Sequence, residues 1–185
     1  MQKKQREINS NFPETKEMLR AQLAEKPGTM LEAFAKNHGL TVAEVIELLP
    51  NNTWKKMDKA FLIDLLKTLP DIGKVTTVIH TADVIFEFSG HFPRGGMAHG
   101  FYNLSFKSPF HGHIRINNCQ SIYLIERPFM KTQTVSVQFV NTEGDVMFKV
   151  FAGRDENHHL IQKQVETMRQ WFTDDFQRSL MEKTQ

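Results

Sequence analysis

Hydrophobic residues recur three and four positions apart through much of residues 10–70, a spacing typical of short amphipathic helices. Four such helices are predicted. Their first residues or caps are Pro13 with Glu14, Thr29, Thr41 and Phe61. Breakers between them, such as Pro27 with Gly28 and Pro50 with Asn51, predict tight connections. Residues 1–70 are therefore expected to form a helical N-terminal part.

Two of these helices have the spacing of a capping box, in which a threonine is followed three residues later by a glutamate. Thr29 precedes Glu32, and Thr41 precedes Glu44. Gly39 follows the second helix, where a glycine in the left-handed conformation typically ends a helix. We expect both glutamates to close their own helix ends.

The pattern changes from helical to alternating at Lys74, so residues 70–73 are the best internal boundary. Seven strands are predicted, and the loops between them are too short for crossover helices. The sheet should therefore be antiparallel and mostly a meander. The predicted strands are Val75–Thr81, Val84–Ser89, Gly100–Phe106, Gly112–Ile116, Ser121–Arg127, Thr134–Val140 and Val146–Ala152.

From Glu156 the period is helical again, and a long apolar face predicts one C-terminal helix packed on the sheet. The fold class is α+β. Residues 71–185, the sheet with this helix, and residues 1–70 are expected to form one compact domain, since 185 residues suffice for a single core.

Charge and composition exclude several classes of protein. The formal net charge of +2 gives no polybasic signal for nucleic acid or an anionic membrane. No apolar stretch approaches a membrane span, and the first residues lack the apolar core of a signal peptide. With Cys119 as the only cysteine, the chain fits a reducing compartment, so we expect a cytoplasmic location.

The second and third helices have the spacing of a helix-turn-helix, with a small Ala35, a turn at Gly39 and Val45. A recognition helix needs basic or amide side chains to meet phosphates and bases. The third helix offers Glu44 and Glu47 instead. This pattern favours a packed helix pair, and a DNA-binding regulator is kept as an alternative.

Five of the eight histidines lie between Lys74 and Ile116. His80 follows two branched apolar residues, which fits a ligand site for a flat apolar metal complex and fits an ordinary core histidine equally. His111 and His113 share one face of a predicted strand, but no carboxylate at fixed spacing completes a metal site. The loop His91–Gly100 is either exposed or a lid. Recognised catalytic motifs are absent from the sequence.

Several long blocks of the sequence cover nearly all of residues 28–165, namely LEAFAKNHGLTVAEVIELLP, GKVTTVIHTADVIFEFSG, HGFYNL, GHIRINNC, SIYLIERPFM and VFAGRDE. These blocks resemble the cytosolic haem-utilisation carrier proteins of the HutX and ChuX type. The resemblance implies a helical part packed on an antiparallel sheet, and a homodimer.

The resemblance also implies that His80 in TTVIHTAD and His113 in GHIRI match the histidines associated with haem binding. We expect both to be ligands of the haem iron, on strands of the same sheet that face one apolar pocket. His99 in HGFYNL is a third match, and Tyr102 is a further candidate ligand. Candidate partners for ligand carboxylates such as the haem propionates are Arg94, Arg115, Arg127 and Lys131, although charges at strand ends are commonly just solvated.

The function implied is a haem carrier that passes imported haem to a haem-degrading or haem-using enzyme. A haem-degrading enzyme is the alternative.

Overall fold

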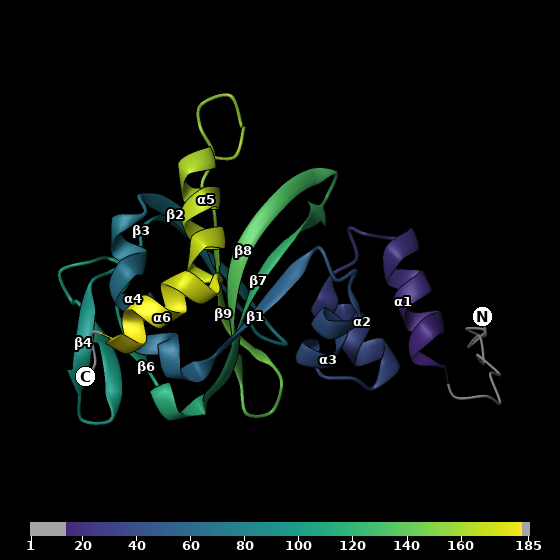
Figure 1. The fold of residues 1–185 in the computed structure, drawn as a ribbon, viewed down its shortest axis with the longest axis horizontal. Helices are drawn as coiled ribbons and strands as arrows, with labels where there is room; N and C mark the ends of the chain where they lie inside the picture. Colours follow the sequence, from purple (N-terminus) through teal and green to yellow (C-terminus); the bar gives the residue numbers. More distant parts are fainter. Residues whose placement is uncertain (1–13, 183–185) are drawn as a thin grey trace, which may run out of the picture.

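A computed structural model describes residues 14–182 as helices on both faces of an antiparallel sheet (Figure 1). The helices are α1 (Lys16–Glu25), α2 (Leu31–His38), α3 (Val42–Leu48), α4 (Leu62–Thr68), α5 (Gln162–Trp171) and α6 (Asp174–Glu182). The strands are β1 (Trp54–Asp58), β2 (Lys74–His80), β3 (Ile85–His91), β4 (Gly95–Ala98), β5 (Phe101–Leu104), β6 (His113–Ile114), β7 (Cys119–Phe129), β8 (Thr132–Asn141) and β9 (Val146–Phe151).

The strands form two sheets rather than one. A six-stranded sheet has the order β1-β7-β8-β9-β2-β3, and a three-stranded sheet has the order β4-β5-β6. Strands β7, β8 and β9 are the expected meander, while the β2–β3 hairpin joins beside β9 and β1 pairs with β7. The α+β class and the antiparallel pairing are confirmed.

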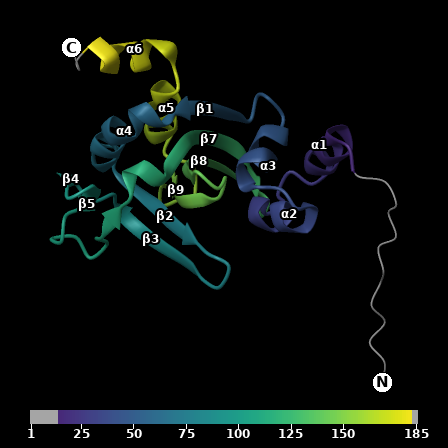
Figure 2. The ribbon, with the colours of Figure 1, turned by 90° about the horizontal axis from the view of Figure 1, so that it is seen from below.

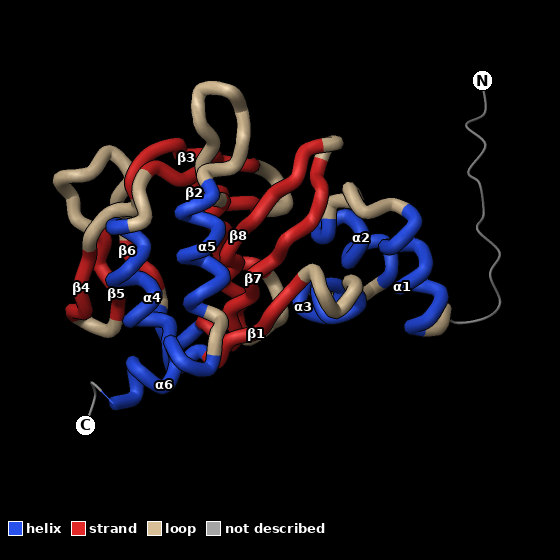
Figure 3. The backbone as a smooth tube through the Cα atoms, turned by 45° about the horizontal axis from the view of Figure 1, so that its top comes forward, coloured by secondary structure: helices blue, strands red, loops and turns tan. Residues whose placement is uncertain are grey.

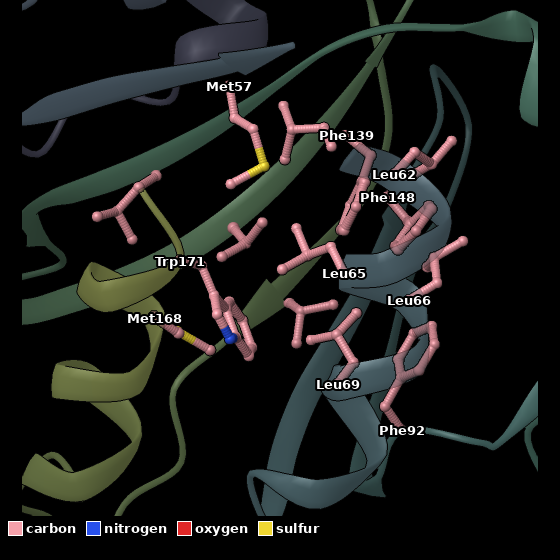
Figure 4. Close-up of a cluster of buried hydrophobic side chains, with 14 of the residues drawn as sticks. Met57, Leu62, Leu65, Leu66, Leu69, Phe92, Phe139, Phe148, Met168 and Trp171 are labelled. Atoms are coloured by element: carbon pink, nitrogen blue, oxygen red, sulfur yellow. The ribbon is translucent and has the colours of Figure 1, made fainter. Parts of the chain in front are cut away.

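One face of the six-stranded sheet is covered by α4 and α5 (Figure 3). Leu65, Leu66 and Trp171 reach from these helices to Phe139 on β8 and Phe148 on β9, and all five are buried (Figure 4). The Phe139 and Phe148 rings stack at 4.3 Å between centroids. Apolar burial of this kind is the main stabilising term of the fold.

The opposite face of the sheet is covered only in part. Helices α1, α2 and α3 are grouped at one end of the molecule, away from α4, α5 and α6 (Figure 2). They form a second core, in which Val45 and Ile46 pack with Tyr123, Ile125 and Val140 of the sheet. The remainder of this face, towards β2 and β3, is left for a groove described below.

Several local predictions need correction. β1 and α4 lie within the predicted helical part, yet their side chains Met57 and Leu65 belong to the main core, so residues 1–70 do not form a purely helical unit. The WKKMD segment lacks an alternating pattern because β1 is an edge strand with its two lysines in solvent. Pro13, expected at the first helix start, lies outside the described residues.

The single C-terminal helix is in fact two. Phe172 leaves the helical conformation, and the Thr173 hydroxyl accepts a hydrogen bond from the Phe176 N–H at 3.3 Å, which starts α6. The turn lets α6 leave the line of α5. Among residues 14–182, no helix has the length and apolar character that crossing a membrane requires.

Candidate functional site

His80 is the last residue of β2, at the border of the uncovered sheet face. Its backbone pairs with Ile85 on β3, and its side chain is 16% exposed. The imidazole lines a pocket of about 120 Å³ whose apolar wall includes Val78, Ile125 and Phe151. Residues Val78 and His80 share this face because side chains two apart on a strand point the same way.

A carboxylate and an ammonium group lie beside His80. Oε1 of Glu32 on α2 is 3.5 Å from His80 Nδ1 and also forms an ion pair with Nζ of Lys149 on β9. Burial by itself raises the pKa of Glu32, but the charge of Lys149 and its hydrogen bond outweigh this and hold that pKa below the ordinary value. Glu32 is therefore a carboxylate at neutral pH.

Two further polar groups line the same pocket. Arg127 on β7 is buried, and its burial lowers the pKa of the guanidinium. Gln138 on β8 is 4% exposed and donates from Nε2 to the Ser136 hydroxyl at 3.2 Å. Within the described residues its Oε1 has no hydrogen-bond partner. A buried amide oxygen without a partner is costly, which is typical of a site that a ligand completes.

The pocket opens into a wider groove of about 630 Å³. The two share the side chains of Val78, Glu87, Phe129, Thr134 and Phe151, so they are one continuous depression on the uncovered face. Its size lies within the ordinary range for small-ligand sites. The depression combines apolar walls with an imidazole and two cationic side chains at one end.

His113 does not join this depression, contrary to the prediction. It lies on β6 in the second sheet, and it lines a separate cavity of about 370 Å³ with Ile79 and Phe148. Ile79 adjoins His80 on β2, and Phe148 adjoins Lys149 on β9, so the two cavities lie on opposite faces of the six-stranded sheet. Within one chain, His80 and His113 cannot reach the same ligand.

His113 is itself oriented by a neighbour. Its Nδ1 donates to Oδ1 of Asn103 on β5 at 2.6 Å, which leaves Nε2 without a partner among the described residues. Arg115 lines the same cavity, with its guanidinium 5.0 Å from the centroid of the Phe101 ring. This second cavity thus also places an imidazole and a cation beside apolar walls.

The other predicted site residues lie elsewhere. His99 is exposed in the turn between β4 and β5 with a φ of 52°, and Arg94 pairs with Asp71 at the surface. Tyr102 is fully buried in the main core, against Gly95, and cannot reach a ligand in this conformation. Tyr102 as a haem ligand is therefore not supported by the fold.

Sequence reasoning named Arg127 as a candidate partner for ligand carboxylates but missed three other residues of the pocket, namely Glu32, Gln138 and Lys149. A weak signal existed for two of them, since Gln138 and Lys149 interrupt the predicted strands with long polar side chains among apolar neighbours. Glu32 was expected to cap its own helix, but α2 has no side-chain cap, whereas Glu44 does complete its predicted capping box. Its contacts depend on strand pairing that the sequence does not specify locally.

Comparison with known proteins gives consistent matches. The family model described as haem utilisation ChuX/HutX matches residues 56–171, more than half of the chain. The intracellular heme transport protein HutX of Vibrio cholerae is 35% identical over 147 residues, 78% of this chain and 76% of HutX.

Two solved structures have the same fold at similar identity. A protein from Erwinia carotovora superposes with a TM-score of 0.79 at 38% identity, over 83% of this chain and 96% of that one. The heme binding protein ChuX superposes with a TM-score of 0.74 at 39% identity, over 82% of this chain and 95% of ChuX. The arrangement of sheets and helices described above is thus shared with proteins of known structure.

Proposed function

Because the chain belongs to the ChuX/HutX family of haem-utilisation proteins, we propose that it is a cytoplasmic haem carrier. It accepts imported haem and passes it to a haem-degrading or haem-using enzyme. The observation that supports this most directly concerns His80. Its Nε2 has no hydrogen-bond partner among the described residues, and its ring lines the pocket with the apolar wall.

Haem is a flat apolar molecule with an iron at its centre and two carboxylates at one edge. The depression offers matching groups: Phe129 and Phe151 for the porphyrin, the His80 imidazole for the iron, and Arg127 for a carboxylate. Lys149 is already paired with Glu32, whereas Arg127 forms no ion pair with a carboxylate among residues 14–182 and bonds to backbone carbonyls, so Arg127 is the better partner.

A carrier must also release its cargo. An open groove and one protein ligand on the iron favour exchange, whereas two strong ligands in a closed cavity slow dissociation. His80 alone supplies the iron ligand from within this chain, since His113 faces the other side of the sheet. We propose His113 as a second haem contact that acts from a partner subunit.

The partner subunit in this proposal is a second copy of the chain. β3 is an edge strand of the six-stranded sheet, with no further strand beside it in the described part of the chain, and its side chains are unusually apolar for a surface strand. Ile85, Phe86 and Phe88 are 51%, 54% and 39% exposed. An exposed apolar edge of this kind is a site for strand pairing, which supports a homodimer formed through β3.

Titration of the purified protein with hemin, followed at the Soret band, tests the proposal. We expect saturation near one hemin per chain, a shifted Soret maximum in His80→Ala, and faster haem loss to an acceptor such as apomyoglobin. His113→Ala is expected to give a smaller change. His159→Ala is the control, because its side chain is 80% exposed and outside both cavities. Unchanged spectra in both His80→Ala and His113→Ala would reject the ligand assignment.

The same sample separates carriage from degradation. Ascorbate under oxygen, with catalase present to remove peroxide, should leave the Soret band intact if the protein only carries haem. Progressive loss of the band with formation of a bile pigment would instead establish a haem-degrading enzyme.

A further inference from the structure

Two arginines of the depression are held by backbone carbonyl oxygens and not by carboxylates. Arg127 on β7 donates to two carbonyl oxygens of the segment before α2. Arg154, which follows β9, donates from Nη1 to the His158 carbonyl at 2.8 Å and from Nη2 to the Gln133 carbonyl at 2.5 Å. Neither arginine forms an ion pair in the described part of the chain. A carbonyl oxygen fixes a guanidinium group without neutralising it, so both arginines keep an uncompensated positive charge.

The two arginines lie on either side of β8 at the same level of the sheet. Arg127 is paired with Thr134 across the β7–β8 ladder, and the carbonyl that holds Arg154 belongs to Gln133, the residue before Thr134. β7 and β9 flank β8, which separates them by about 10 Å across the sheet. Arg127 lines the pocket and Arg154 lines the groove that continues it. One end of the depression therefore carries two fixed cations.

Both arginines have donors left for a ligand. Arg127 is 8% exposed, and its Nη1 has no hydrogen-bond partner among residues 14–182. The Nε of Arg154 likewise has no partner within those residues. Lys74, exposed at the start of β2, adds a third cation to this end of the groove. A guanidinium group that is already held in place loses little conformational freedom when it binds a carboxylate.

The carboxylates of the chain near the depression do not compete for these arginines. Glu32 is paired with a lysine, as described above. Glu87 on β3 is four strands from Arg127, about 19 Å across the sheet, which exceeds the screening length of about 8 Å in physiological salt. Asp155 follows Arg154, but its Oδ1 accepts hydrogen bonds from backbone N–H groups of its own loop. The arginine end therefore favours an anion from outside the chain.

The depression is long enough for a flat ligand to lie between the arginines and His80. By the register of the sheet, Lys74 is level with Thr134, so the start of β2 marks the arginine end. His80 is the last residue of β2, about 20 Å along the strand from Lys74. Porphyrins such as haem carry two carboxylates on short flexible chains at one edge of the ring. The two cations at one end of the depression match these two carboxylates in number and sign.

We propose that Arg127 and Arg154 each bind one carboxylate of the same porphyrin. The acidic edge of the ligand then lies at the arginine end of the depression, and the centre of the ring lies towards His80. The proposal rests on the haem-carrier function stated above and narrows its substrate to porphyrins with two free carboxylates. Esters of the same porphyrins keep the apolar ring but lose both charges, so they should bind more weakly.

Metal-free protoporphyrin IX tests this proposal without any contribution from an iron ligand. Its binding to the wild type is measured by fluorescence titration and compared with the binding of its dimethyl ester. A hydrogen bond from a charged group is strong enough to change the dissociation constant about tenfold. Arg154→Gln should therefore raise the dissociation constant of the diacid about tenfold and leave that of the ester unchanged. Equal affinities of the wild type for the two ligands would overturn the proposal.

Arg154→Lys separates the charge of this residue from its hold on the loop. Lysine keeps the positive charge but cannot donate to both carbonyl oxygens as the guanidinium group does, so it should retain most of the preference for the diacid. If Arg154 only holds its loop, Arg154→Lys and Arg154→Gln will weaken the diacid and the ester alike, which rejects the proposal.

Arg178→Gln is the matched control for net charge. Arg178 is 69% exposed on α6, where it pairs with Asp175 outside the depression. This variant should bind the diacid as the wild type does. A weakening equal to that in Arg154→Gln would mean that the overall charge of the protein, and not the arginine end, selects the diacid, and the proposal would fail.

Arg127→Gln should lower the preference for the diacid in the same way, with urea unfolding used to show that the variant is folded during the titration. An unchanged preference in the folded variant would reject the role of Arg127. Hemin titration of the wild type separates this proposal from the function on which it rests. If hemin does not bind, both are rejected. If hemin binds but the diacid has no advantage over the ester, only the assignment of the two arginines is rejected.

Discussion

Arg127 donates two hydrogen bonds to the carbonyl oxygen of Pro27, from Nε at 3.0 Å and from Nη2 at 2.5 Å. A third bond from Nη2 reaches the Thr29 carbonyl at 2.5 Å. These bonds join β7 to the segment between α1 and α2, 100 residues away in sequence. They are the polar part of an attachment that the second core otherwise provides through apolar contacts.

Replacement of Arg127 by leucine should loosen this attachment. A hydrogen bond from a charged group contributes about 1.5–3 kcal/mol to stability. The two carbonyl groups would stay partly buried without their donor. We therefore expect the free energy of unfolding to fall by about 2 kcal/mol. Amide exchange should accelerate in α1 and α2 more than in β7 and β8. Arg169→Leu is the control, since its ion pair with Glu126 is at the surface and should cost less than about 1 kcal/mol.

The ionisation of Glu32 makes a defined contribution to stability across pH. Its pKa is lowered on folding, so its stabilisation is fully present above the ordinary value of 4.5 and is lost as the pH falls through the lower value in the folded protein. Urea unfolding of the wild type and Glu32→Gln should therefore differ at pH 7 and converge in acid. A constant difference at all pH values would show that the charge is irrelevant.

Lys149→Met tests the other half of the ion pair. The methionine fills a similar volume, but it leaves the half-buried Glu32 carboxylate without its ammonium partner, which should cost about 3 kcal/mol. In the double variant with Glu32→Gln the second loss should be much smaller, because no charge is then left unpaired. Strict additivity of the two losses in urea unfolding would mean that the residues do not interact.

The proposed homodimer predicts that two variants differ in molecular mass when measured by light scattering. Phe86→Lys puts a charge on the apolar edge of β3 and should give a monomer at micromolar concentration. Phe106→Lys is the matched control, because Phe106 is 82% exposed in a loop outside β3. A dimer that persists in Phe86→Lys, or a wild-type monomer, would contradict pairing through β3.

The sequence pattern predicted most elements, although burial does not alternate along β7 and β8, which are buried over most of their length. β2, β7, β8 and β9 lie close to the expected ranges. β4 was missed because its GGMA sequence indicates a loop. Gly95 is there for packing, since a Cβ at this position would lie 2.5 Å from Cε1 of Tyr102. The sequence alone does not distinguish a glycine that is needed for close packing against a neighbour from a glycine that lies in a flexible loop.

The site was predictable only as far as single residues carried a signal. His80 was identified, but its setting was not, because Glu32 and Lys149 approach from elements 48 and 69 residues away in sequence. His113 was placed with His80 because the resemblance implied a haem role for both and both lie on or beside predicted strands. In the structure the two histidines lie in different sheets. The local pattern of apolar and polar residues does not indicate that the strands divide into two sheets.

The two edges of the six-stranded sheet differ in chemistry. At the far edge from β3, β1 presents Lys55 and Lys56, both exposed. A second chain approaching β1 with its own β1 would bring like charges together and would have to desolvate them. If copies associate through β3, the lysines of β1 stop the sheet from growing at its other end. Self-association then closes at a pair and does not extend into a filament, even where the local concentration of the protein is high.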